Sequence, residues 1–177
     1  MKNIYLHIGP HKTASSSIQL GLKEARNTLR DHGIHFPLLP GPDLIPQPNH
    51  SAIFYSLFSD CAENYHINRR AGIETAEAAD SLNQEYRTRL IRELQGTDKT
   101  NLLFSGEDIL LLSDNETKKL RSFFLHQVGD DCNIEIICSI RNPIDWYSSL
   151  VQQWVRGGAC FEEALQTPCP SLKQWLK

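Results

Sequence analysis

Three short apolar runs, each followed by a polar loop and then by apolar residues at helical spacing, constrain the fold most strongly. They lie at residues 4–8, 101–105 and 133–139. Runs of this length, bounded by polar segments, are typical of buried strands. Strands that alternate with helices predict an α/β fold, in which helices flank a parallel sheet and cover both of its faces.

The segments between these runs carry helical signals. Apolar residues recur at helical spacing after the first run, and Asn142-Pro143 after the third run is a typical helix start, with Asn as the cap and Pro in the first turn. The segment 32–50 has five prolines, which predict an ordered loop or lid. The expected helices span about 13–29, 51–61, 74–94 and 115–127, with a further one from Pro143.

Length and composition predict one domain, residues 1–177. With 40% hydrophobic residues the chain can bury one sizeable core. Only three strand candidates occur before the chain stops, which favours a domain that lacks its C-terminal elements. A net charge of -3 gives no general attraction to nucleic acid, so no nucleic-acid partner is expected. The sequence also lacks a long apolar run, so we expect no membrane insertion and a cytoplasmic location.

The five cysteines form no C-x-x-C pair, which argues against a disulfide framework or a zinc site. Cys138 stands inside the third apolar run and is expected to be a small core residue.

The segment HIGPHKTASSS, residues 7–17, directly follows the first run and has the chemistry of an anion-binding loop. Backbone N–H groups at the start of a helix attract negative charge, and Lys12 adds a full positive charge. Hydroxyl-bearing residues at a helix start also serve as plain N-caps, which is the alternative interpretation. The candidate binding residues are Gly9, His11, Lys12, Thr13, Ala14, Ser15, Ser16 and Ser17.

A second candidate pair follows the third run. Arg141 ends the strand and Ser149 comes eight residues later, on the second turn of the expected helix. An arginine fork beside a hydroxyl suits a phosphate monoester. The alternative is an ion pair of Arg141 with Asp145 and exposed serines. Both loops follow parallel strands at their carboxyl ends, where open α/β sheets bind ligands, which favours a shared site.

GPHKTASSS and the distant RNPIDWYSS together resemble the two nucleotide-binding motifs of the sulfotransferases that use 3'-phosphoadenosine 5'-phosphosulfate (PAPS). The resemblance, over residues 3 to about 156, implies a P-loop NTPase-like sulfotransferase architecture and PAPS as the donor, with no metal. It implies that the first loop, with Lys12, holds the 5' side. Arg141 and Ser149 would hold the 3'-phosphate. Ala14 departs from the family pattern, since it replaces the usual loop glycine and demands a conformation that tolerates a Cβ.

In-line sulfuryl transfer needs charge stabilisation at the leaving phosphate and a base for the acceptor hydroxyl or amine. Lys12 suits the first task. Glu107, in FSGED after the second run, and His50, at the end of the proline-rich segment, compete for the second, with Asp108 as a weaker candidate. Each of them has a plain structural interpretation as a helix cap or an exposed residue. The acceptor can be a glycan, a lipid or a small molecule, and the sequence does not choose.

Two rival functions stay open. Lys12-Thr13 copies the ending of a kinase-type P-loop, although neither later run closes directly on an acidic residue that could hold magnesium. A non-catalytic nucleotide-binding module is the other rival. Among the neighbouring residues, His7 is expected to be a satisfied interior histidine, and Trp146, Tyr147 and Trp154 are expected to pack in the core or under a lid.

Overall fold

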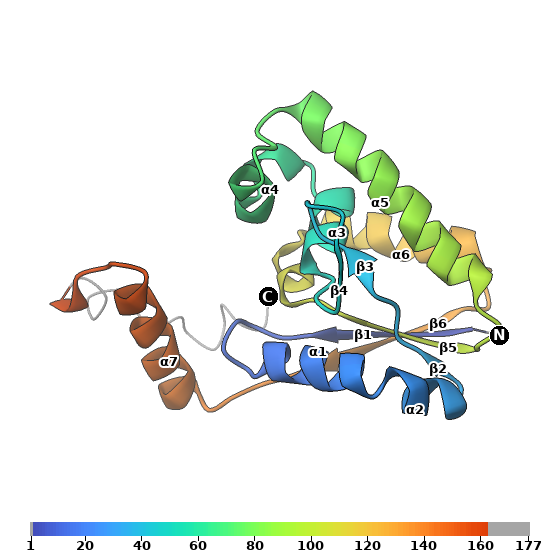
Figure 1. Cartoon of the computed structure of the whole chain (residues 1–177), viewed down its shortest axis with the longest axis horizontal. Coiled ribbons are helices and arrows are strands. Elements are labelled where there is room, and N and C mark those ends of the chain that lie inside the picture. Colours follow the sequence, from blue (N-terminus) through green and yellow to red (C-terminus); the bar gives the residue numbers. More distant parts are fainter. Residues whose placement is uncertain (1, 163–177) are drawn as a thin grey trace.

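The computed structural model describes residues 2–162 and contains a four-stranded parallel sheet in the order β2-β5-β1-β6 (Figure 1). This confirms the predicted α/β class. The three longer strands are β1 (Asn3–Ile8), β5 (Asn101–Ser105) and β6 (Asn133–Cys138), and they coincide with the three apolar runs. Whether residues 1–177 form one domain stays a prediction.

The register of the sheet brings the carboxyl ends of the three strands together. β1 lies between β5 and β6, and Asn3 is paired with both Asn101 and Asn133. At the other end of β1, His7 lies opposite Ser105 of β5 and Ile137 of β6. The loops that follow these strands therefore leave the sheet at one edge.

Helices flank the sheet on two sides. In Figure 1, α1 and α2 run along one face, α3, α5 and α6 lie over the other, and α7 projects beyond the end of β6. The expected helix over 13–29 is divided at Ala25, whose backbone ψ of 7° interrupts the helical geometry. The helices are α1 (Ser15–Glu24), α2 (Arg26–Asp31), α3 (Ser51–Phe58), α4 (His66–Arg70), α5 (Ala76–Gly96), α6 (Asp114–Val128) and α7 (Pro143–Arg156).

The hydrophobic core fills the space between the sheet and α3, α5 and α6. Alternate residues of β1, Ile4 and Leu6, point into it and are at most 3% exposed. Phe54 of α3 meets Phe104 of β5 edge to face, with 5.3 Å between ring centroids. A capping box of Ser113 and Glu116 starts α6, which fixes where that helix joins the core.

The proline-rich segment is more regular than expected. It contains three two-residue strands, β2 (Ile34–His35), β3 (Leu39–Pro40) and β4 (Pro46–Gln47). β2 adds the fourth strand of the main sheet, whereas β3 and β4 form a small antiparallel hairpin. Strands of two residues give no periodic signal, and so the sequence did not predict them. The short 3-10 helices η1 (Ala62–Asn64) and η2 (Glu107–Leu111) were likewise not predicted.

The prediction that helices cover both sheet faces fails at β6, which is largely exposed. Ile136 and Ile137 are 55% and 46% exposed, and Cys138 is exposed as well. The expectation of a core Cys138 was therefore wrong. The reason is position: β6 is the outer strand of the sheet, and an apolar run alone does not distinguish an edge strand from a central one.

Candidate functional site

The β1–α1 loop is held tightly against the end of β6. A Cβ at Gly9 would lie 2.9 Å from the backbone oxygen of Ser139, so only glycine fits there. Lys12 and Ala14 both have left-handed backbone conformations, with φ of 71° and 68°. Thr13 is buried and its hydroxyl donates to the Pro10 carbonyl at 2.8 Å. The loop is therefore a tight, fixed turn. The side chain of Ala14 occupies a position at which the loops that this sequence resembles have glycine.

Helix α1 starts at this loop without a side-chain cap, because its N-cap residue is Ala14. The N–H groups of a first helical turn have no partners inside the helix and carry the positive end of the helix dipole. The serines of this turn differ in setting: Ser15 is buried, whereas Ser16 and Ser17 are exposed. The alternative interpretation, in which the hydroxyl-bearing residues serve as the N-cap of this helix, is not supported, because the N-cap residue is alanine. The start of α1 therefore offers free backbone N–H donors to an anion.

Arg141 and Ser149 meet as the spacing predicts. Arg141 Nη1 donates to Ser149 Oγ at 2.8 Å and to the backbone oxygen of Lys12 at 3.3 Å. These contacts tie the end of β6 and helix α7 to the β1–α1 loop. Trp146 of α7 is buried and its indole N–H donates to the His11 carbonyl at 2.6 Å, which makes it a packing residue of the loop.

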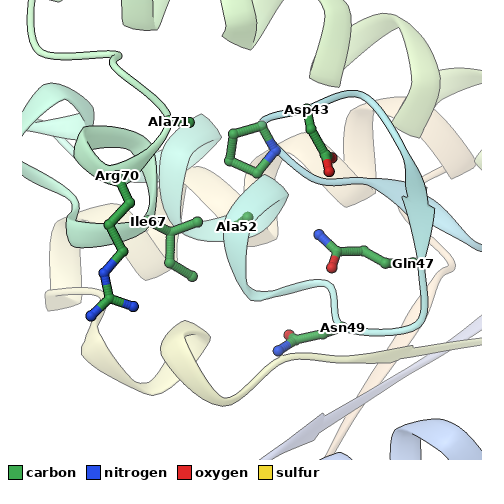
Figure 2. A pocket seen from close by; sticks show the side chains of 8 residues that line it. Asp43, Gln47, Asn49, Ala52, Ile67, Arg70 and Ala71 are labelled. Atoms are coloured by element: carbon green, nitrogen blue, oxygen red, sulfur yellow. The ribbon is translucent and has the colours of Figure 1, made fainter. Parts of the chain in front are cut away.

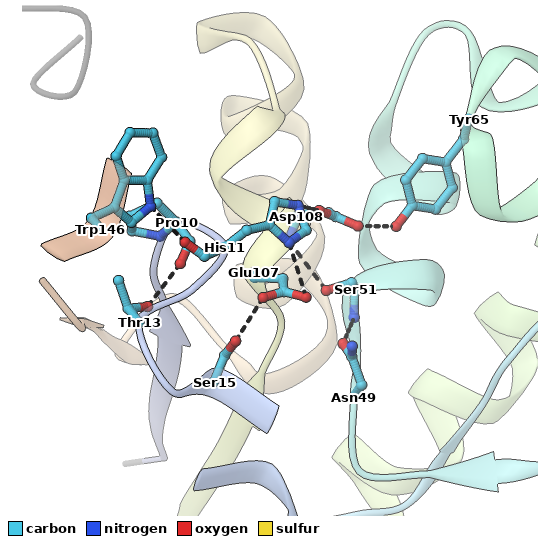
Figure 3. Close-up of polar contacts among 10 residues, drawn as sticks. All are labelled: Pro10, His11, Thr13, Ser15, Asn49, Ser51, Tyr65, Glu107, Asp108 and Trp146. Atoms are coloured by element: carbon cyan, nitrogen blue, oxygen red, sulfur yellow. Dashed lines mark hydrogen bonds and ion pairs between the residues drawn. The ribbon is translucent and has the colours of Figure 1, made fainter. Parts of the chain in front are cut away.

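A charged cluster lies beside the loop, where His11 sits between two carboxylates (Figure 3). His11 Nδ1 is 3.2 Å from Glu107 Oε1, and His11 Nε2 is 3.0 Å from Asp108 Oδ1. Ser15 Oγ donates to the other oxygen of Glu107 at 2.6 Å, and the Tyr65 hydroxyl donates to Asp108. The start of η2, after β5, is thus joined to both the loop and α1.

Electrostatics keep all three members of this cluster charged at neutral pH. Asp108 and Glu107 together raise the pKa of His11 to about 10. Burial by itself would raise the pKa of Glu107, but the interactions with His11 and Ser15 outweigh it and hold that pKa below its usual range. Burial would likewise raise the pKa of Asp108, but the interactions with His11 and Tyr65 hold that pKa below its usual range. An imidazolium therefore lies between two ionised carboxylates.

These elements enclose a cavity of about 390 Å³ whose lining is mainly polar. The β1–α1 loop and the start of α1 form one side of it, and Glu107, Arg141 and α7 supply the rest. The lining residues are His11, Lys12, Ala14, Ser15, Ser16, Glu107, Arg141 and Gln153. Seven of the eight were site candidates from the sequence, and the structure brings these candidates together from three separate segments.

Other predicted residues lie beside the cavity rather than on its lining. Gly9 and Thr13 shape the loop, and Ser149 orients Arg141. Ser17 is exposed on α1 and is not part of the lining. Of the residues that sequence reasoning missed, Gln153 had a usable signal, because it stands one helical turn after Ser149 on α7. Tyr65 had none, since it lies in an unpredicted stretch far from either motif.

His50 does not fit the predicted role of a catalytic base. Its ring is fully buried, Nε2 lies 3.0 Å from the Pro37 carbonyl, and Nδ1 accepts the Ser105 N–H at 3.0 Å. Burial lowers the pKa of His50 to about 4, so the ring is neutral. Both ring nitrogens are occupied by the protein, and His50 instead connects the proline-rich segment to the end of β5.

His7 is the satisfied interior histidine that the sequence predicts. Its Nδ1 lies 2.8 Å from Ser105 Oγ and its Nε2 2.8 Å from Ser139 Oγ. Burial lowers the pKa of His7, so the ring is neutral. This one ring bridges the ends of all three long strands. Because these ends lead to Lys12, Glu107 and Arg141, His7 contributes to the alignment of the cavity lining.

Two properties of residues 2–162 bear on metal binding and on membranes. In this part of the chain, no group of three or more His, Cys, Asp or Glu side chains is arranged to hold a metal ion. None of the described helices is long and apolar enough to span a bilayer.

Comparison with protein-family models, curated proteins and solved structures found no match for this chain.

Proposed function

We propose that the protein is a sulfotransferase of P-loop NTPase-like architecture, which transfers a sulfuryl group from PAPS to a hydroxyl or amine. The observation that carries the proposal is the convergence of Lys12, the Arg141–Ser149 pair and Glu107 around one cavity. The resemblance assigns Lys12 to the 5' side of the donor and Arg141 with Ser149 to its 3'-phosphate, and Glu107 is one of the base candidates from the sequence. They come from the loops after the three adjacent strands.

The donor set of the cavity fits a nucleotide with two separate anionic groups. Lys12, the first-turn N–H groups of α1 and the hydroxyl of Ser16 would hold the phosphosulfate. Arg141 already directs one guanidinium nitrogen at a hydroxyl, the arrangement expected for a phosphate monoester at the 3' position. When bound, PAPS supplies an activated sulfuryl group.

Glu107 is the proposed general base. Its carboxylate lines the cavity and is ionised at neutral pH, so it can accept the proton of an acceptor hydroxyl. As the acceptor oxygen forms its bond to sulfur, the bond from sulfur to the phosphate oxygen breaks, and its electron pair stays on the phosphate. Lys12 and the N–H groups of α1 stabilise that negative charge.

His11 has a supporting role in this proposal. Its imidazolium lies beside the donor loop and adds positive charge on the side where the phosphates bind. It also holds Glu107 and Asp108 in their ionised forms. The kinase and binding-module alternatives enter here as outcomes of the tests.

A transfer assay with variants tests the proposal. The protein is incubated with PAPS and a panel of hydroxyl and amine acceptors, and the gain of an SO3 group is followed by mass spectrometry. Glu107→Gln should lose transfer by about a hundredfold or more while still binding 3'-phosphoadenosine 5'-phosphate (PAP). Glu85→Gln, an exposed residue on α5, is the control. Full activity of Glu107→Gln would remove Glu107 from the mechanism.

A further inference from the structure

A second cavity, of about 300 Å³, lies on the side of the molecule where the proline-rich segment packs on α3 and α4 (Figure 2). None of its residues belongs to the lining of the proposed donor cavity. The β3–β4 hairpin, the start of α3 and the end of α4 form its walls. It is lined by Pro42, Asp43, Gln47, Asn49, Ala52, Ile67, Arg70 and Ala71.

The hairpin gives one wall of this cavity a defined shape. The turn between β3 and β4 closes through a bond from the Leu44 N–H to the Gly41 carbonyl, at 2.9 Å. A Cβ at Gly41 would lie only 2.2 Å from Gln47 Nε2, so the missing side chain makes room for the glutamine amide. In Figure 2 the Gln47 amide points into the cavity from the side opposite Arg70.

The polar groups of the cavity suit a ligand with hydroxyls and one negative charge. Arg70 is exposed, and the described residues offer it neither an ion pair nor a hydrogen bond, so its planar fork is available for a carboxylate. Asn49 uses its Oδ1 to accept the Ser51 N–H at 2.9 Å, which leaves its NH2 group as a donor. Gln47 adds a second amide, and Asp43 an acceptor for hydroxyl groups.

The remaining lining is apolar and small. Pro42, Ala52, Ile67 and Ala71 contribute no charge and no side-chain hydrogen bond. An apolar lining of this kind can pack against the C–H groups of a sugar ring, while the two amides and Asp43 offer hydrogen-bond partners to its hydroxyls. Together with Arg70, the cavity matches a sugar that carries a carboxylate better than a purely apolar ligand or a neutral one.

A short chain of contacts connects this cavity to the backbone of Asp108, the neighbour of the proposed base Glu107. Asn49 lines the cavity and accepts the Ser51 N–H, and Ser51 Oγ in turn accepts the backbone N–H of Asp108 at 3.2 Å. Figure 3 shows Asn49, Ser51 and Asp108, together with Glu107, the sequence neighbour of Asp108. His50 lies between Asn49 and Ser51 in the sequence, and its backbone N–H donates to the Ser105 carbonyl at 2.7 Å. This bond fixes the segment against the end of β5.

We propose that this second cavity is the acceptor site and that the acceptor is an acidic sugar of the uronate class, with its carboxylate on Arg70. The assignment of the cavity as an acceptor site rests on the proposed sulfotransferase function. The chemistry of the ligand rests on the cavity lining alone.

The test compares two ligands that differ only in the charged group. Binding of methyl β-D-glucuronide and of methyl β-D-glucoside is measured by saturation-transfer NMR and calorimetry on the full chain. The glucuronide should bind at least tenfold more tightly, and Arg70→Ala should abolish this preference. Arg69→Ala, an exposed neighbour that does not line the cavity, should leave it unchanged. Equal binding of the two sugars would overturn the assignment of the ligand. So would an equal loss of glucuronide binding in Arg70→Ala and Arg69→Ala.

A second comparison separates this inference from the proposed function. Lys12→Ala should lose PAP binding but keep glucuronide binding, because Lys12 lines only the first cavity. In the wild-type chain, PAP and the glucuronide should bind together without displacing each other. Competition between them would place both ligands in one cavity and overturn the acceptor site. Glucuronide binding without any PAP binding would overturn the sulfotransferase proposal while leaving the sugar site in place.

Discussion

Ala14 shows at the scale of one residue how the loop departs from its expected form. The sequence predicts that alanine at this position demands a backbone conformation that tolerates a Cβ, and the structure places Ala14 at φ 68° and ψ 17°. A non-glycine residue in this region costs roughly 1–2 kcal/mol. The loop therefore keeps a glycine-like turn in spite of its side chain, and the strain is stored next to the proposed phosphate site.

Replacing Ala14 by glycine should relieve this strain. Glycine loses more backbone entropy on folding, so we expect Ala14→Gly to raise the free energy of unfolding by only about 0.5–1 kcal/mol. Ala25→Gly at the other end of α1, where φ is -82°, should lower it by about the same amount. Urea denaturation of both variants checks the pair. A lower free energy of unfolding in Ala14→Gly would contradict the inference that the backbone of Ala14 is strained.

His11 should remain protonated far above the usual range of a histidine. Its pKa of about 10 exceeds the ordinary value of 6.5, so the unfolded chain releases this proton first as pH rises. The stabilisation from His11 is fully present below pH 6.5 and is lost as pH rises through about 10. An NMR titration of the histidine side chains measures this, and titration of His11 near 6.5 would contradict the ion-pair cluster.

Residue roles were only partly readable from the sequence. His7 was expected to be an interior residue because it alternates with apolar neighbours, and both of its ring nitrogens are bonded in the structure. His50 was misjudged as a base, since its burial comes from Phe36, Phe54 and Phe104, whose rings surround it only once the chain is folded. Contacts between distant segments decide such cases, and residue type alone does not.

At the scale of elements, the important contact is that between the β1–α1 loop and the end of β6. Gly9 packs on Ser139, and Arg141 donates a hydrogen bond to the Lys12 carbonyl. The two proposed phosphate-binding segments, the β1–α1 loop and the segment after β6, therefore hold each other in place. Because a shift of one segment moves the other, a substitution at Gly9 should weaken ligand binding as well as lower the stability of the fold.

Gly9→Ala tests this coupling. The new Cβ would meet backbone and must push the loop away from β6, at a cost of about 1–3 kcal/mol in stability. PAP binding should fall at least tenfold. Gly21→Ala within α1 is the matched control, because nothing lies within 4 Å of its Cβ position, and it should stabilise the helix by about 0.5–1 kcal/mol. Calorimetry and urea denaturation give both values, and unchanged PAP binding in Gly9→Ala would refute the coupling.

The longer helices and strands followed from local sequence signals, whereas the short elements, helix α4 among them, did not. β5 and the start of α7 lie where the apolar run and the Asn142-Pro143 pair place them. β2 and the β3–β4 hairpin were missed because pairs of two residues depend on partners far along the chain. The exposure of β6 was missed for a related reason, since a sheet edge is a property of the whole arrangement and not of one run.

At the scale of the whole molecule, the parallel sheet is what turns scattered residues into one site. Lys12, Glu107 and Arg141 are far apart in the sequence but follow three adjacent strands, and the carboxyl ends of such strands share an edge. This convergence could be predicted once the strands were recognised. The ion pairs of His11 and the second cavity could not, because both depend on side-chain placement in η2 and in the proline-rich segment.

Calorimetric titration with PAP, in the absence of metal, tests the central claim most directly. We expect binding without Mg²⁺, weakened at least tenfold by Lys12→Ala and by Arg141→Ala, which corresponds to about 1.4 kcal/mol or more each. The matched controls Lys23→Ala and Arg156→Ala, exposed residues at the ends of α1 and α7, should bind as the wild type does. A preference for Mg-ATP, or PAP binding that neither Lys12→Ala nor Arg141→Ala weakens, would contradict the sulfotransferase assignment.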